Sequence, residues 1–210
     1  MTDTSVSGLM MARFTDSQKQ ERREQILAAA RGCFSRNGFH NTTTADIARA
    51  AGVAQGTFYL YFPTKDDVIV ALANGRRDGE ALINALASAE SDAIEGLRSL
   101  LDLHTQTLSD PQRRDERRVA IQAWAEGLRN EVVRRQLLEN TSLVIDEIAD
   151  LIRRGISDGQ FKSDANPESV ARALVALFRG LTVQAAWDDI YAPERLGTAV
   201  GDMLRGALLP

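Results

Sequence analysis

Apolar residues recur at intervals of three and four positions along almost the whole chain, which is the period of an α-helix with one buried face. One such series runs through Ile94, Leu97, Leu101 and Leu108. Stretches that alternate apolar and polar residues and are rich in β-branched side chains, as strands are, are nearly absent. The 210 residues therefore predict an all-α fold of about nine helices.

Capping residues, glycines and prolines predict where these helices begin and end. Thr15 with Gln18, and Thr43 with Asp46, have the spacing of capping boxes. Glycine and proline signals interrupt the helical pattern at Asn37-Gly38, Gly52, Pro63, Gly159, Asn166-Pro167 and Pro193. The predicted helices span about residues 16–37, 44–51, 54–62, 65–89 and 130–158, and others begin at Ser91, Asp110-Pro111, Asn166-Pro167 and Pro193. We expect residues 1–14 to form a flexible N-terminal tail.

The scarcity of cysteine and histidine limits the chemistry that this chain can perform. Cys33 is the only cysteine, which excludes an internal disulfide and a cysteine-built metal site. His40 and His104 are the only histidines, and we predict neither a metal site nor a cofactor. The sequence carries no nucleophile–base signature, glycine-rich phosphate loop or paired acid motif, so an enzyme is not expected.

Hydropathy gives no sign of a membrane segment in the sequence. The most apolar stretch, residues 170–187, is interrupted by Arg172 and Arg179. The N-terminus lacks the basic region and the long apolar run of a signal peptide. We therefore expect a soluble, cytoplasmic protein with no membrane partner.

Charge is distributed unevenly along the chain. The formal net charge is −4, which alone disfavours a general nucleic-acid binder. Residues 12–65, however, carry eight basic and four acidic groups, whereas residues 66–210 carry 17 basic and 24 acidic groups. A basic N-terminal part on an acidic body suggests a module that faces phosphates, the alternative being a chance asymmetry of solvated helix faces.

The segment from Thr42 to Lys65 has the spacing of a helix-turn-helix. A capped helix of about eight residues is followed by a turn at Gly52 and by a second short helix. A small apolar core is predicted from Ile47, Ala48, Ala51, Val53, Phe58 and Phe62. Once these positions are assigned to the core, the outward positions of the second helix are Gln55, Gly56, Thr57, Tyr59, Leu60 and Tyr61.

These outward residues suit the major groove of DNA. A glutamine presents a donor and an acceptor to base edges, and Leu60 can contact a thymine methyl group. The hydroxyls of Thr57, Tyr59 and Tyr61 can reach phosphate oxygens. The alternative is that Tyr59 or Leu60 packs against the first helix.

The stretch RREQILAAARGCFSRNGFHNTTTADIARAAGVAQGTFYLYFPTKDDVIVAL resembles the N-terminal domain of TetR-family transcriptional repressors. The resemblance rests on G-F-x-x-T-T, I-A-x-x-A-G-V, G-T-F-Y-x-Y-F and K-D. It implies a homodimer that reads palindromic double-stranded operator DNA and a larger C-terminal domain that binds a small effector. The implied division is a tail over 1–14, a DNA-binding domain over 15–65 and an effector-binding and dimerisation domain over 66–210.

The resemblance also assigns residues to DNA contacts. Gln55, Gly56, Thr57, Tyr59 and Tyr61 lie on the family's recognition helix, and Leu60 lies between them. Thr43, Thr44 and Lys65 match the family's phosphate contacts. Ala54 departs from the pattern, because many members have a serine cap there, and loss of such a cap costs about 1 kcal/mol.

The last two predicted helices are expected to form the dimer interface, because the resemblance implies a four-helix bundle between subunits. Their apolar faces offer Leu174, Leu177, Phe178, Leu181, Leu196, Val200, Met203 and Leu204. The alternative is that these faces fold inward within one subunit.

Residues for the effector pocket are predicted from aromatic or polar side chains on otherwise apolar faces. They are His104, Trp124, Phe178, Gln184 and Trp187, and the two tryptophans favour an apolar or aromatic effector. Each could instead be an ordinary core residue. The polar segment Asn74–Gly79 is the predicted bend in the helix that joins the two domains.

Two functional alternatives stay open at the level of sequence. The chain could be a helical ligand carrier that has lost DNA binding, or a regulator that activates transcription instead of repressing it.

Overall fold

The computed structural model describes residues 16–73, 92–187 and 193–209, and for residues 193–196 the backbone alone. Within these ranges the chain forms nine α-helices and one short 3-10 helix, and no strand. The predicted all-α class is therefore confirmed. The tail over 1–14, the Asn74–Gly79 bend and the Thr15 cap lie outside the described residues.

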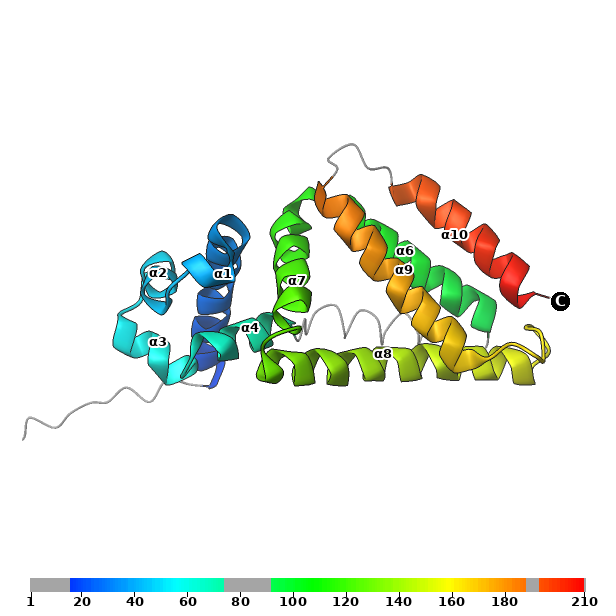
Figure 1. Ribbon diagram of the computed structural model, residues 1–210, viewed down its shortest axis with the longest axis horizontal. Coiled ribbons are helices and arrows are strands. Elements are labelled where there is room, and N and C mark those ends of the chain that lie inside the picture. Colours follow the sequence, from blue (N-terminus) through cyan, green and yellow to red (C-terminus); the bar gives the residue numbers. More distant parts are fainter. Residues whose placement is uncertain (1–15, 74–91, 188–192, 210) are drawn as a thin grey trace, which may run out of the picture.

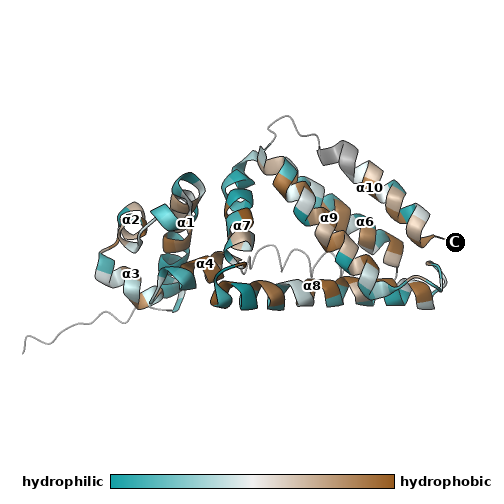
Figure 2. Ribbon diagram, viewed as in Figure 1, coloured by the Kyte–Doolittle hydropathy of each residue, from teal (hydrophilic) through white to brown (hydrophobic). Residues whose placement is uncertain are grey.

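Four helices form an N-terminal head at one end of the molecule (Figure 1). They are α1 (Asp16–Asn41), α2 (Thr44–Ala50), α3 (Gln55–Tyr61) and α4 (Lys65–Ala73). Figure 2 shows that α4 is apolar along most of its length, and it buries Val68 and Ile69 in the core of the head. The domain boundary predicted at Lys65 stays a prediction, since α4 contacts α1 of the head as well as α7 and α8 of the body.

The remaining helices form an elongated body. They are α6 (Ala93–Ser109), the 3-10 helix η1 (Pro111–Arg113), α7 (Arg114–Glu126), α8 (Glu131–Ser157), α9 (Pro167–Trp187) and α10 (Pro193–Leu208). In Figure 1, α7, α8 and α9 form the sides of a triangle, and α10 lies at the outer edge. α10 packs against α6.

Local capping explains why most helices begin where the sequence predicts. The capping box of Thr43 and Asp46 is present at the start of α2, and Asn130 caps α8 through the backbone amides of Val132 and Val133. Gly159 has a φ of 72°, which suits its position after α8. The start of α6 is capped by Asp92 instead of Ser91, and the α-helix after Asp110 begins only at Arg114, because one 3-10 turn comes first.

The core of the head extends into the body. Its buried residues include Phe34 and Phe39 of α1 and Phe58 of α3. The same cluster contains Val119 and Ala123 of α7, so α7 closes the head core from the body side. A second cluster fills the body between α6, α8 and α9, around Ile148, Ile152 and Leu174. The predicted core of the helix-turn-helix is confirmed, with Ile47 and Phe58 fully buried.

No helix among the described residues is long and apolar enough to cross a membrane. The described part of the chain also brings together no group of three or more histidine, cysteine, aspartate or glutamate side chains that could hold a metal ion.

Candidate nucleic-acid interface

The turn between α2 and α3 is held by backbone hydrogen bonds and by α1. The amide of Val53 donates to the carbonyl of Ala48 at 3.0 Å, and Gly52 has a φ of 64°, which a glycine adopts without strain. The side-chain amide of Gln25 in α1 donates to the carbonyl of Ala51 at 2.7 Å. The angle between α2 and α3 is therefore fixed by contacts on both sides of the turn.

The outer face of α3 is exposed, as the sequence predicts. The side chain of Leu60 is 83% exposed and that of Tyr59 is 45% exposed. Gln55 and Gly56 are exposed, and Thr57 is half-buried. The alternative that Leu60 packs against the first helix is therefore wrong, and a large apolar side chain at such exposure suits a partner surface.

Tyr59 is held in place by α2. Its hydroxyl shares a hydrogen bond with the hydroxyl of Thr44 at 3.0 Å. Its ring meets Phe58 edge to face, with ring centroids 5.5 Å apart. Tyr61 is half-buried and packs against the head core, so only part of its ring faces outward.

Two of the predicted phosphate contacts also support the fold of the head. The hydroxyl of Thr43 donates to Asp46 Oδ2 at 2.6 Å, and this bond and the Thr43 amide hold the pKa of the Asp46 carboxyl below its ordinary value. The ammonium of Lys65 donates to the carbonyls of Phe39 at 2.6 Å and of Thr42 at 3.1 Å. With three N–H donors, Lys65 keeps one for another acceptor.

Lys19 and Arg22 of α1 are interface candidates that the sequence analysis missed. With Thr57, Leu60 and Tyr61 they line a hollow of about 480 Å³ beside the α2–α3 turn. The guanidinium of Arg22 donates to Gln25 Oε1 at 2.7 Å, which orients it on α1. Their three-residue spacing on the helix preceding the helix-turn-helix is the signal that could have identified them.

The predicted effector residues fall into separate places. The ring of His104 in α6 stacks on that of Phe178 in α9, with centroids 4.3 Å apart. Trp124 of α7 lies under the guanidinium of Arg179, whose Cζ is 5.6 Å from the ring centroid. Gln184 is exposed and Trp187 is 81% exposed, at the end of α9. The first three side chains are therefore internal contacts of the body, whereas Gln184 and Trp187 are surface residues.

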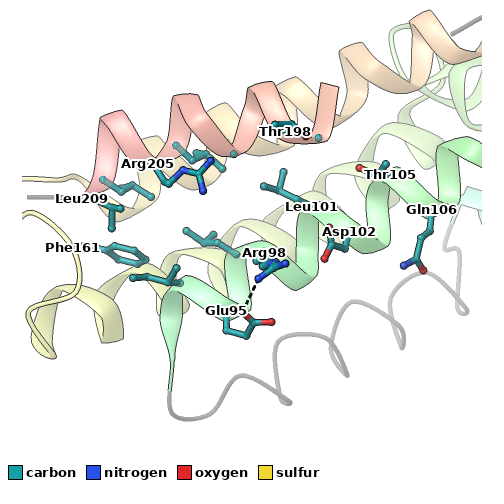
Figure 3. A pocket seen from close by; sticks show the side chains of 16 residues that line it. Glu95, Arg98, Leu101, Asp102, Thr105, Gln106, Phe161, Thr198, Arg205 and Leu209 are labelled. Atoms are coloured by element: carbon teal, nitrogen blue, oxygen red, sulfur yellow. Dashed lines mark ion pairs between the residues drawn. The ribbon is translucent and has the colours of Figure 1, made fainter. Parts of the chain in front are cut away.

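A groove of about 620 Å³ runs between α6 and α10 (Figure 3). Its apolar lining includes Leu101, Leu204 and Phe161, and its charged groups include an ion pair between Glu95 and Arg98 at 3.9 Å. None of the five predicted effector residues lines it.

The predicted dimer face is partly used inside the subunit. Leu174, Leu181 and Val200 are buried within the chain, because α6, α8 and neighbouring turns of the body cover them. Leu177, Phe178 and Leu204 are half-buried, and Met203 is 69% exposed. The side chain of Leu196 lies outside the described residues. Of the predicted set, Met203 offers the most exposed apolar surface.

The helix-turn-helix and its exposed α3 define a DNA-binding transcriptional regulator. Residues 26–72 match the family model of bacterial regulatory proteins of the tetR family, and residues 93–209 match that of the C-terminal part of BetI-type transcriptional repressors. The chain belongs to the TetR family of transcriptional regulators, whose members are not enzymes.

Individual relatives support this assignment over most of the chain. The HTH-type transcriptional regulator UidR of Escherichia coli K12 is 26% identical over 194 residues, which cover 91% of this chain and 95% of the relative. The structure of Salmonella enterica GusR is 25% identical with a TM-score of 0.75, over 92% of this chain and 97% of that chain. A putative transcriptional regulator from Saccharomonospora viridis, in complex with choline, is 28% identical with a TM-score of 0.75, over 91% and 99%.

Proposed function

We propose that this regulator is a homodimeric repressor that binds a palindromic operator and is released by a small-molecule effector. The observation that carries the proposal is the exposed polar and apolar face of α3, on which Leu60 is 83% exposed. Nothing within the described part of the monomer covers this face. A ligand carrier without DNA binding has no use for such a surface.

In this proposal α3 lies in the major groove. Gln55 reads an adenine through its paired donor and acceptor, and Leu60 contacts a thymine methyl group. Thr44 and Tyr59, which already share a hydrogen bond, and Lys65 with its remaining donor contact phosphates. Lys19 and Arg22 add a positively charged contact with the backbone at the side of α3.

Dimerisation places the two heads on one face of the DNA. We propose that the subunits meet through the outer faces of α9 and α10, where Trp187 and Met203 are 81% and 69% exposed. Ala173, Ala176 and Gly180 line the exposed side of α9 and allow close helix approach. Leu174, Leu181 and Val200, buried inside the subunit, are no longer assigned to this interface.

Effector release requires that the body and the head be coupled. α4 of the head contacts α7 and α8 of the body, and α7 contacts α1 of the head as well as α8 and α9. An effector held near Trp124, His104 and Phe178 would therefore contact α7, the helix that closes the head core. A tenfold loss of operator affinity needs about 1.4 kcal/mol of coupling. The choline complex of the Saccharomonospora viridis relative supports a small-molecule site in proteins of this kind.

Selection of bound duplexes from a random-sequence DNA library tests the proposal directly. The expected result is enrichment of an inverted repeat whose half-site centres lie about 34–36 Å apart, or a multiple of this distance. Absence of any enriched sequence, or enrichment of an asymmetric site bound by one subunit, contradicts the proposal. Transcription from a promoter that carries the selected site then separates repression from activation.

A further inference from the structure

Arg179 lies in the middle of α9, and its side chain reaches α7 and α8. Its guanidinium lies over the ring of Trp124 in α7, with Cζ 5.6 Å from the ring centroid. Its Nη2 donates a hydrogen bond to the hydroxyl of Thr141 in α8. Two neighbouring helices therefore fix the position of one cationic group.

No carboxylate among the described residues pairs with Arg179. Its hydrogen bond to Thr141 and its contact with Trp124 are its interactions there. Burial lowers the pKa of this guanidinium, and no acidic neighbour counteracts the effect. The group nevertheless stays charged near neutral pH, because an arginine is always protonated in proteins.

Arg117 shows how the same body compensates a guanidinium that is buried, whereas that of Arg179 is half-buried. Its Nη1 donates to the carbonyls of Thr107 at 3.2 Å and of Asp110 at 2.9 Å, at the C-terminal end of α6. Burial lowers the pKa of Arg117 as well, but the neighbouring carboxylate of Asp110 opposes this shift. Arg117 therefore serves the fold, whereas no carboxylate in the described part of the chain faces the charge of Arg179.

The guanidinium of Arg179 retains the donors that an anion needs. A guanidinium has five N–H donors, of which the Thr141 hydroxyl accepts one. The rest suit a carboxylate, sulfonate or phosphate, which can accept two parallel hydrogen bonds. Removing a cation from water without a partner is unfavourable, so an anion bound here recovers part of that cost.

We propose that the effector carries an anionic group that pairs with Arg179, and an apolar part that lies against the aromatic side chains of α7 and α9. This inference rests on the proposed function, because it assigns a chemical class to the effector of that same regulator. An anionic effector would also distinguish this chain from its relative that was solved in complex with choline, a cation. Arg179 already occupies a face of Trp124, so a quaternary ammonium is repelled from the position where a cation–π contact would hold it.

Two fluorescent probes with the same ring system test the charge requirement. They are 8-anilinonaphthalene-1-sulfonate, which is anionic, and N-phenyl-1-naphthylamine, which lacks the sulfonate. We expect the wild type to bind the sulfonate at least tenfold more tightly than the neutral amine. Arg179→Gln should abolish this preference, and Arg179→Lys should retain most of it because it keeps the charge. Equal sulfonate affinity in the wild type and Arg179→Gln overturns the inference.

A second measurement locates the bound probe. In a Trp187→Phe variant, Trp124 is the only tryptophan, so quenching of its emission by the sulfonate reports binding near Arg179. Arg205→Gln is the matched control, since Arg205 lines the groove between α6 and α10. We expect this control to bind the sulfonate as the wild type does. A loss of affinity in Arg205→Gln and not in Arg179→Gln places the anion in that groove and overturns the inference.

Failure of this inference is distinguishable from failure of the proposed function. The probes report only on Arg179, whereas duplex selection with the wild type reports on DNA reading by the head. If duplex selection yields an inverted repeat but Arg179→Gln binds the sulfonate as tightly as the wild type does, the repressor proposal stands. The proposal of an anionic effector is then wrong. If choline raises the unfolding midpoint of the wild type and displaces the sulfonate, the anionic effector is likewise contradicted while the repressor proposal stands.

Discussion

The side-chain oxygen of Gln122 in α7 accepts a hydrogen bond from the backbone amide of Phe39 in α1 at 3.1 Å. The nitrogen of the same side chain donates to the carbonyl of Phe34 at 3.0 Å. These two bonds span Gly38, where the helical path of α1 is broken, and they give partners to backbone groups on both sides of the break. One body residue thus completes the backbone of the head.

Replacement of Gln122 by leucine should lower the free energy of unfolding by about 1–3 kcal/mol, because two half-buried backbone groups lose their partner. Urea unfolding followed by circular dichroism measures the change. Gln112→Leu is the matched control, since Gln112 is exposed in η1, and it should leave the unfolding midpoint unchanged. Equal midpoints for the two variants would show that α7 does not support the head in this way.

Gly38→Ala should destabilise the protein by about 1–3 kcal/mol for a conformational reason. Gly38 has φ 78° and ψ 167°, a region that residues with a Cβ atom rarely adopt. A methyl group there has room, since its nearest neighbour is Gln122 Oε1 at 3.7 Å. Gly206→Ala in α10 should instead stabilise by about 0.5–1 kcal/mol, because Gly206 is exposed on a helix with open space around it. If Gly38→Ala and Gly206→Ala shift the midpoint of thermal unfolding in the same direction, the conformational explanation is wrong.

Leu60→Ala should weaken binding to the selected duplex about tenfold while leaving the unfolding midpoint unchanged. The reason is that its side chain is 83% exposed and contributes little to the core. Leu143→Ala in α8 is a matched control, because that leucine is 65% exposed on the body. Fluorescence anisotropy of labelled duplex measures both affinities. Similar affinities for the two variants would remove Leu60 from the DNA contact.

The basic residues Lys19 and Arg22 lead to a prediction about the salt dependence of DNA affinity. Lys19→Gln and Arg22→Gln should each lower the slope of log affinity against log salt concentration by about one, because each variant leaves one phosphate without its cationic partner. Their effect should be similar on all duplexes, because phosphate contacts carry no base information. Arg98→Gln, in the groove of the body, should leave the slope unchanged. An unchanged slope in Arg22→Gln would place this residue away from DNA.

The hydrogen bonds of Asp46 lead to a prediction about how the stability of the head depends on pH. Hydrogen bonds from the side chain and backbone of Thr43 hold its pKa below the ordinary 3.8, so the carboxylate stabilises the folded head above that pH. The contribution is lost as the pH falls through the lower pKa of the folded state. We expect the difference in unfolding midpoint between wild type and Asp46→Asn to shrink as the pH falls below 3.8. If the difference in unfolding midpoint between the wild type and Asp46→Asn stays constant until Asp46 is fully protonated, the Asp46 carboxylate is not its source.

The features that were predictable from sequence are those that depend on neighbours along the chain. The Thr43–Asp46 box, the turn at Gly52 and the outward position of Leu60 follow from local spacing, and the structure shows each of them. Exposure of Leu60 follows because the small core of the head is already filled by Ile47 and Phe58. Local chemistry is sufficient for such features.

Contacts between distant helices were not predictable in the same way. Gln122 meets Phe39 across 83 positions, and no periodicity links two such residues. The apolar stripe of α9 was predictable, but its partner was not, since a stripe does not specify whether Leu174 meets its own α8 or a second subunit. From sequence, Arg179 was interpreted only as a charge that interrupts an apolar stretch, because the contacts that surround it in the described structure exist only after folding.

Ala54 begins α3 without a side-chain hydrogen bond to the first turn. An alanine there leaves the opening amides of a seven-residue helix dependent on water until the helix reaches a duplex. We therefore expect docking on DNA to stabilise this turn most where α3 makes its full set of contacts. On this expectation the protein dissociates faster from mismatched sequences than from the correct one.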